Sequence, residues 1–182
     1  MGGKLTAAAA ASLALLALSI APAASAAPVV TAKPTLEQNV VARINAVRRS
    51  HGLRPLRVVP RLADAADRHA ASMGRSSYFR HDLFTPARQR DWTPFGTWIR
   101  WFWPGPGYGS WSAGENLAWG APGITARQTV GRWMRSPGHR ANILNPRWRN
   151  IGLGAVHVKR PIRYFAAWDD VTIVVAEFGR RS

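Results

Sequence analysis

Apolar residues recur every three or four positions in two segments of the first half of the chain. The first segment begins at Thr35, which can cap a helix, and ends before Gly52; its apolar face consists of Leu36, Val40, Ile44 and Val47. Arg43 and Arg48 fall on its other faces. The second segment runs from Pro60 to Gly74, with an inner face of Leu62, Ala65, Ala66, His69 and Met73. These patterns predict two amphipathic helices.

The second half of the chain changes from helical spacing to β-rich runs. A third helix is predicted from Thr125, and Pro137 either starts a new turn after it or kinks it. Residues 151–158 and 171–178 are rich in β-branched residues and predict two strands joined by a turn over 159–170. Because the helices come first and the strands last, the pattern favours an α+β fold over a series of βαβ units.

Residues 83–113 fit neither pattern. They hold most of the aromatic side chains, interrupted by proline and glycine, and they predict one short helix near 94–102 followed by a long loop. Trp98, Trp101 and Trp103 lie in its most apolar stretch. Such a segment either buries its rings as a satellite core or exposes some of them as a platform for a ligand. We expect partial burial with two or three rings accessible.

The N-terminus has the three parts of a secretory signal peptide. A positive start at residues 1–4 precedes an apolar run over 5–20, and the small residues 24–26 follow. We therefore expect a signal peptide over 1–26, a linker over 27–34 and one domain over 35–182 with a Trp-rich insertion at about 83–113. The run is short for a membrane span, although an uncleaved anchor is the alternative. No second long apolar stretch follows, so the mature protein is expected outside the cytoplasm with no transmembrane segment.

Composition narrows the possible partners and chemistry. The chain has 182 residues and no cysteine, which excludes disulfides, thiol catalysis and Cys-ligated metals. The chain has 25 lysines and arginines but only 9 acidic residues, which gives a net charge of +16. This charge falls to +15 if Lys4 leaves with the signal peptide. An anionic lipid surface or envelope polymer would suit this charge, and a bias of composition toward arginine is the alternative explanation. No nucleic-acid-binding motif is present, and we do not expect a nucleic acid as a partner.

Few residues are candidates for chemistry. The chain has no phosphate-binding glycine loop, no His-Glu-x-x-His and no Gly-x-Ser-x-Gly. Glu115 lies between a glycine and an asparagine, and His81 and His139 neighbour polar residues near predicted loops or helix ends. His69 is better explained as a core histidine of the second helix.

Several motifs, taken in order, resemble the CAP superfamily of cysteine-rich secretory, antigen 5 and pathogenesis-related proteins, in its cysteine-free bacterial branch. The matching segments span about 36–178 and are Asn45-x-x-Arg48, Phe79-x-His81-Asp82, Gly114-Glu115-Asn116-Leu117, Trp133-Met134-x-Ser136-Pro137-Gly138-His139-Arg140-x-Asn142-Ile143-Leu144 and Ile151-Gly152-Leu153-Gly154. The resemblance implies a three-layer α-β-α sandwich and an open cleft lined by His81, His139 and Glu115. Many members carry a second glutamate where this chain has Ser136.

The resemblance leaves four possibilities for the cleft open. His81, His139 and Glu115 could bind Zn²⁺ with an open coordination position for water, or they could form a hydrogen-bonded network that fixes loops. Ser136 could act as a nucleophile beside His139, although a role as a helix cap before Pro137 is favoured. A vestigial cleft in a structural or adhesive envelope protein is the fourth possibility.

We expect a secreted, monomeric binding module rather than an enzyme. Its ligand would be a lipid, an amphipathic molecule or an anionic cell-envelope polymer, held by the cleft together with Trp98, Trp101 and Trp103. The alternative is a protease-like, metal-assisted hydrolase that uses His81, His139 and Glu115.

Overall fold

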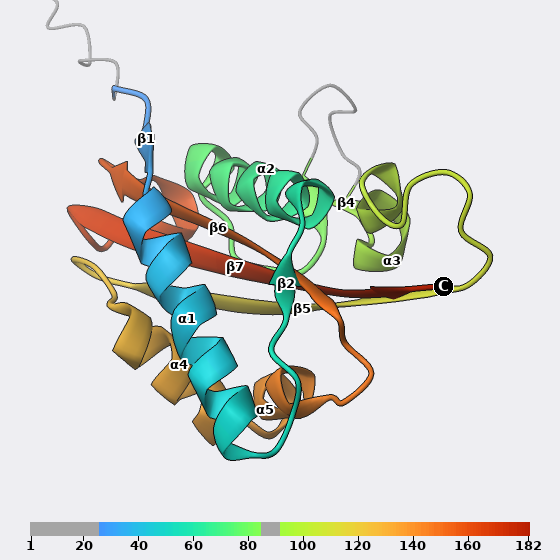
Figure 1. Ribbon diagram of the computed structural model, residues 1–182. Helices are drawn as coiled ribbons and strands as arrows, with labels where there is room; N and C mark the ends of the chain where they lie inside the picture. Colours follow the sequence, from blue (N-terminus) through green and yellow to red (C-terminus); the bar gives the residue numbers. More distant parts are fainter. Residues whose placement is uncertain (1–25, 85–91) are drawn as a thin grey trace, which may run out of the picture.

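The computed structural model describes residues 26–84 and 92–182 (Figure 1). Its helices are α1 (Pro34–Ser50), α2 (Pro60–Ser76), α3 (Phe95–Trp98), α4 (Ala126–Arg135) and α5 (Pro137–Leu144), with 3₁₀ turns η2 (Ile99–Trp101) and η3 (Arg163–Phe165). Its strands are β1 (Val29–Ala32), β2 (Arg57–Val58), β3 (Leu83–Phe84), β4 (Trp92–Thr93), β5 (Trp111–Gly120), β6 (Asn150–Lys159) and β7 (Asp170–Arg181). No helix within these described ranges is long and apolar enough to cross a membrane.

The main sheet has the strand order β1-β6-β7-β5, and all three of these pairings are antiparallel. The short β2 adds a parallel pairing to β6, while β3 and β4 form a separate two-stranded ribbon. The two longest ladders join β7 to β5 and to β6, so β7 lies in the middle of the sheet. The predicted strands at 151–158 and 171–178 are thereby confirmed as β6 and β7.

Helices cover both faces of this sheet (Figure 1). Helix α2 packs on one face, and α1, α4 and α5 pack on the other. Side chains alternate along β7 accordingly: Ile173 and Val175 join the core under α2, while Val174 and Ala176 join the core under the other three helices. The expected α+β class and three-layer α-β-α sandwich are confirmed.

Two glycines of β6 set the distance between α2 and the sheet. A Cβ atom on Gly152 would lie 2.0 Å from the backbone carbon of Leu62, and one on Gly154 would lie 2.3 Å from that of Ala66. Neither approach is possible for a residue with a side chain. The glycines therefore let the α2 backbone pack directly on β6.

Some predicted boundaries are wrong. Residues 29–32, expected in a linker, form β1 and pair with β6, because their β-branched residues favour a strand that extends the sheet edge. Lys33 rather than Thr35 precedes the first turn of α1, and Pro34 occupies its start. Helix α2 continues past Gly74 to Ser76. Of the two predicted alternatives at Pro137, a new helix is the one found.

The Trp-rich segment is more ordered than expected. The predicted short helix is present as α3 and η2, but residues 111–113 belong to the ten-residue strand β5, which the sequence interpretation did not identify. Residues 1–25, with nearly all of the expected signal peptide, and residues 85–91 of the insertion lie outside the described residues.

Candidate functional site

A pair of glutamates faces α2 from the middle of the sheet. Glu115 on β5 and Glu177 on β7 are directly opposite each other in the antiparallel ladder. Glu115 shares its sheet face with Leu117, and Glu177 shares its face with Val175, so both carboxyl groups point into the layer under α2. Both are buried, Glu177 completely.

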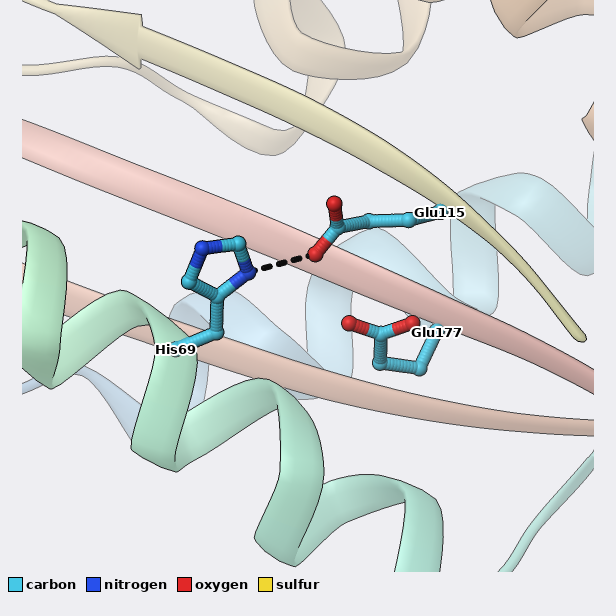
Figure 2. A group of neighbouring side chains, drawn as sticks. All are labelled: His69, Glu115 and Glu177. Atoms are coloured by element: carbon cyan, nitrogen blue, oxygen red, sulfur yellow. Dashed lines mark hydrogen bonds and ion pairs between the residues drawn. The ribbon is translucent and has the colours of Figure 1, made fainter. Parts of the chain in front are cut away.

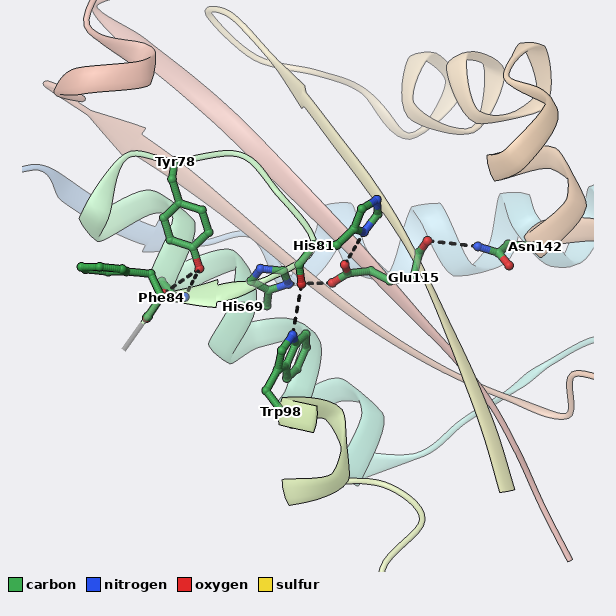
Figure 3. Close-up of polar contacts among 8 residues, drawn as sticks. His69, Tyr78, His81, Phe84, Trp98, Glu115 and Asn142 are labelled. Atoms are coloured by element: carbon green, nitrogen blue, oxygen red, sulfur yellow. Dashed lines mark hydrogen bonds and ion pairs between the residues drawn. The ribbon is translucent and has the colours of Figure 1, made fainter. Parts of the chain in front are cut away.

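Two histidines converge on the carboxylate of Glu115 (Figures 2 and 3). His69 reaches it from the inner face of α2, with Nδ1 2.6 Å from Oε2. His81 reaches it from the loop after α2, with Nδ1 2.6 Å from Oε1. The His69 ring is fully buried, whereas the His81 side chain is 55% exposed. Glu115 thus joins a buried imidazole to one that solvent can reach.

The environment moves the pKa values of these groups in different directions. Burial raises the pKa of Glu115, but the hydrogen bonds from His69 and His81 outweigh burial and leave it below its usual value. Burial and the adjacent Glu115 charge raise the pKa of Glu177 well above its usual value. The hydrogen bond to Glu115 raises the pKa of His81. The two shifts have opposite directions, which favours an ionised Glu115 beside a protonated Glu177.

His139 lies on the solvent side of the same region, at the start of α5. Its side chain is half-buried, and burial followed by the charge of His81 lowers its pKa. A relay of two asparagines fixes this helix to β5: Asn116 Nδ2 donates to the His139 carbonyl oxygen, and Asn142 Nδ2 donates to the Glu115 carbonyl oxygen and to Asn116 Oδ1. Figure 3 shows Asn142 reaching Glu115 from the side opposite the histidines. The relay therefore connects the two histidine motifs through the backbone of β5.

Trp98 supports the site instead of lining it. Its indole is fully buried, its Nε1 donates to the His81 carbonyl oxygen at 3.1 Å, and its ring packs edge-on against His69 at 4.9 Å. Trp103 is fully buried as well. Neither of these two rings, which the sequence predicts as ligand contacts, presents an exposed face, because both fill the core beneath the Trp-rich segment. Trp101, the third ring named, is 54% exposed.

The predicted three-ligand metal set does not come together. Within residues 26–84 and 92–182, the group whose potential ligand atoms lie within 4.8 Å of one another is His69, Glu115 and Glu177, not His81, His139 and Glu115. Both Glu115 oxygens already face histidine Nδ1 atoms. All three members of this group are buried. His81 and His139 remain as two imidazoles without a third protein ligand.

Ser136 lies between α4 and α5. It precedes Pro137, the first residue of α5, but its hydroxyl makes no capping hydrogen bond. No hydrogen bond in the described part of the chain joins Ser136 to His139. The expected side-chain cap is therefore not formed, and a Ser136–His139 nucleophile pair is not assembled.

The sequence interpretation missed His69 and Glu177 as members of the site. His69 was assigned to the core, which is where it lies, but its partner is a carboxylate. The signal for Glu177 was present, because it continues the alternation of Ile173 and Val175 on an otherwise apolar sheet face. An acidic residue at such a position needs a polar partner or a proton.

Comparison with known proteins agrees with this fold. Residues 41–167 match the family described as "CAP: Cysteine-rich secretory protein family". The protein YkwD of Bacillus subtilis is 36% identical over 121 residues, which cover 66% of this chain but 42% of that protein. The chain thus spans less than half of this relative.

Solved structures share the fold at lower identity. An extracellular SCP-domain protein from Bacillus anthracis superposes with a TM-score of 0.61 at 24% identity, over 81% of this chain and 41% of its own. An outer surface protein from Borrelia burgdorferi gives a TM-score of 0.63 at 22% identity, over 84% of this chain and 98% of its own. These proteins are similar to the chain in architecture.

Proposed function

The chain belongs to the cysteine-rich secretory protein (CAP) family, and we propose that it is an exported binding module, not a hydrolase, with His81 and His139 at the mouth of its ligand-binding cleft. The ligand is a lipid, an amphipathic molecule or a component of the cell envelope. The signal-peptide pattern of residues 1–26 supports export, and the excess of arginine supports an anionic partner.

The observation that carries this proposal is the double use of the Glu115 carboxylate. One oxygen holds a buried histidine and the other holds His81, and the Glu115 side chain is only 1% exposed, so the carboxylate itself does not face a ligand in the cleft. What it does is fix the His81 ring. With Nδ1 bound to Glu115, the remaining ring nitrogen, Nε2, faces away from the carboxylate (Figure 3) and is available to a ligand.

One observation favours the alternative, a hydrolase. A buried carboxylate that orients an exposed histidine is the arrangement of a general base. A base also needs a nucleophile or a bound water in reach. Ser136 is not hydrogen-bonded to either cleft histidine in the described residues, and two imidazoles alone hold Zn²⁺ weakly.

The experiment that separates these functions compares wild type with the His81→Ala/His139→Ala double variant. Zn²⁺ titration by calorimetry, binding to phosphatidylglycerol vesicles and hydrolysis of casein would be measured on both proteins. We expect weak, exchangeable Zn²⁺ binding that disappears in the variant, vesicle binding that is reduced, and no hydrolysis by either protein. Hydrolysis by the wild type that is lost in the variant would establish the alternative instead.

A further inference from the structure

A pocket lies beside the Trp-rich segment, apart from the histidine cluster. It has a volume of about 510 Å³ and is lined by Arg61, Arg100, Trp101, Trp103, Pro104, Gly105, Pro106, Tyr108, Gly109 and Trp111. Figure 1 shows the segment after α3 running to the C-terminal end of β7. Arg181, near that end, contacts Pro104, Trp103 and Tyr108 of this segment. The pocket is thus built from α2, η2, the loop before β5 and the start of β5.

The pocket contains both a buried aromatic ring and exposed ones. Trp103 is buried beneath it, and its Nε1 donates to the Ser112 carbonyl oxygen at 3.3 Å. Trp101 and Tyr108 are 54% and 40% exposed. The exposed rings are single and separated, so they offer flat faces for a ligand ring without forming a broad apolar surface that a lipid chain would need.

Arginines surround the rings. The Arg181 guanidinium lies between Trp103 and Tyr108, 4.5 and 4.1 Å from the two ring centres, and its Nη1 donates to the Pro104 carbonyl oxygen. The Arg100 guanidinium lies 5.2 Å from the centre of the Trp111 ring. These contacts hold the cations in place without cancelling their charge.

No acid balances this charge. None of the residues that line the pocket is acidic, and among the described residues no salt bridge involves Arg61, Arg100 or Arg181. Guanidinium groups held beside aromatic rings match a ligand that combines a ring with a carboxylate or phosphate group. An acidic sugar has both: an apolar C–H face for the indole and an anionic group for arginine.

We propose that this pocket, defined by Arg61, Arg100, Trp101 and Tyr108, binds an acidic glycan. The inference goes beyond the proposed binding function: it adds a second site, apart from the cleft, whose ligand class is an anionic sugar polymer of the cell envelope. Trp101 supplies the stacking face, and Arg100 with Arg61 supplies the charge that selects acidic over neutral sugars.

The test is calorimetric titration of the purified protein with a short oligogalacturonate and with a neutral malto-oligosaccharide of the same length. Trp101→Ala and Arg100→Gln are each expected to weaken oligogalacturonate binding about tenfold, the effect of losing one stacking or charged contact. Trp168→Ala and Arg127→Gln are the matched controls. Trp168 is 39% exposed but packs on Trp119, at the other end of β5, so both controls should bind within about twofold of wild type.

Three results would overturn the inference: equal affinity for the acidic and neutral sugars, no effect of either pocket variant, or binding to phosphatidylglycerol vesicles without binding to the glycan. In the last case the proposed binding function would stand and only the ligand class would fall. The His81→Ala/His139→Ala variant separates the two sites. It should bind the glycan as wild type does, even if its Zn²⁺ and vesicle binding are lost.

Discussion

At the scale of single residues, one buried carboxylate determines the state of its neighbours. Glu115 is almost fully buried, yet it stays ionised because two histidine Nδ1 atoms lie 2.6 Å from its oxygens. Burial and the Glu115 charge raise the pKa of Glu177, and the hydrogen bond to Glu115 raises the pKa of His81. The pKa values of these groups are therefore linked, and changing Glu115 should affect both of the others.

Replacing Glu115 with glutamine should lower the pKa of His81. The hydrogen bond to Glu115 is the largest cause that raises this pKa, and the charge of Asp82 is a smaller one. An NMR titration of the His81 ring should thus show a larger decrease for Glu115→Gln than for the control Asp82→Asn. Equal decreases in the two variants would mean that surface charge, not the buried carboxylate, sets the pKa of His81.

The pair also makes stability depend on pH in a defined direction. The Glu177 carboxyl keeps its proton when folded but loses it when unfolded above its usual pKa of 4.5, so the unfolded state binds fewer protons there. Glu177 therefore lowers the free energy of unfolding as pH rises above 4.5, by at most about 1.4 kcal/mol per pH unit for one proton.

Glu177→Gln should remove this decrease of the free energy of unfolding with rising pH. An amide resembles the protonated carboxyl in shape and does not ionise, so the variant should gain stability relative to wild type as pH rises from about 5 to about 7. Urea unfolding at several pH values would measure the difference. A stability difference that is constant over this range would show that Glu177 is ionised in the folded protein.

At the scale of elements, the position of the site depends on how closely α2 approaches β6. His69 reaches Glu115 from the same helix whose backbone rests on Gly152 and Gly154. A side chain at either glycine would push the helix outward and lengthen the bond between His69 and Glu115. The geometry of the site therefore depends on the packing of α2 against the sheet.

Gly152→Ala should destabilise the fold by about 3 kcal/mol or more, because the added Cβ would meet backbone atoms that cannot move independently. Gly138→Ala in α5 is the matched control, since no atom lies within 4 Å of the Cβ position. The control should be neutral or stabilising by about 0.5 kcal/mol. Thermal unfolding of both variants would measure these changes. A small effect at Gly152 would mean that α2 can shift without loss of packing.

Periodic elements could be predicted from the sequence, and long-range polar contacts could not. The spacing of Val40 and Ile44 predicted α1 correctly, because an amphipathic helix repeats its own pattern. Arg48 was placed on an outer face, but it is fully buried and donates to the carbonyl oxygens of Arg54, Ile143 and Asn145. A charged residue inside the core needs partners that are distant in sequence, and local spacing does not reveal them.

The candidate site could likewise be predicted only in part, because its contacts join segments that are distant in sequence. Motifs identified Glu115, His81 and His139, but the partner of each residue depends on strand register. Glu177 is opposite Glu115 only because β5 and β7 pair in one particular register, and β5 was not recognised as a strand. Strand β5 contains two glycines and an asparagine, which weaken the β pattern of its sequence.

At the scale of the whole molecule, the net charge and the aromatic pocket act on a ligand over different distances. The net charge of +16 attracts an anionic polymer from far away, whereas the rings of Trp101 and Tyr108 act only in contact. Charge should therefore control how fast an acidic glycan associates, and the aromatic contacts should control how long it stays bound.

This division predicts opposite kinetic effects of salt and of a pocket mutation. Raising NaCl from about 10 mM to about 150 mM shortens the screening length from about 30 Å to about 8 Å and should lower the association rate constant for oligogalacturonate about tenfold or more. Trp101→Ala should instead raise the dissociation rate constant at either salt concentration and leave association nearly unchanged. Surface plasmon resonance at the two salt concentrations measures both constants. An association rate that does not depend on salt would mean that the arginine excess reflects composition alone, and the pocket would then have to select its ligand without long-range attraction.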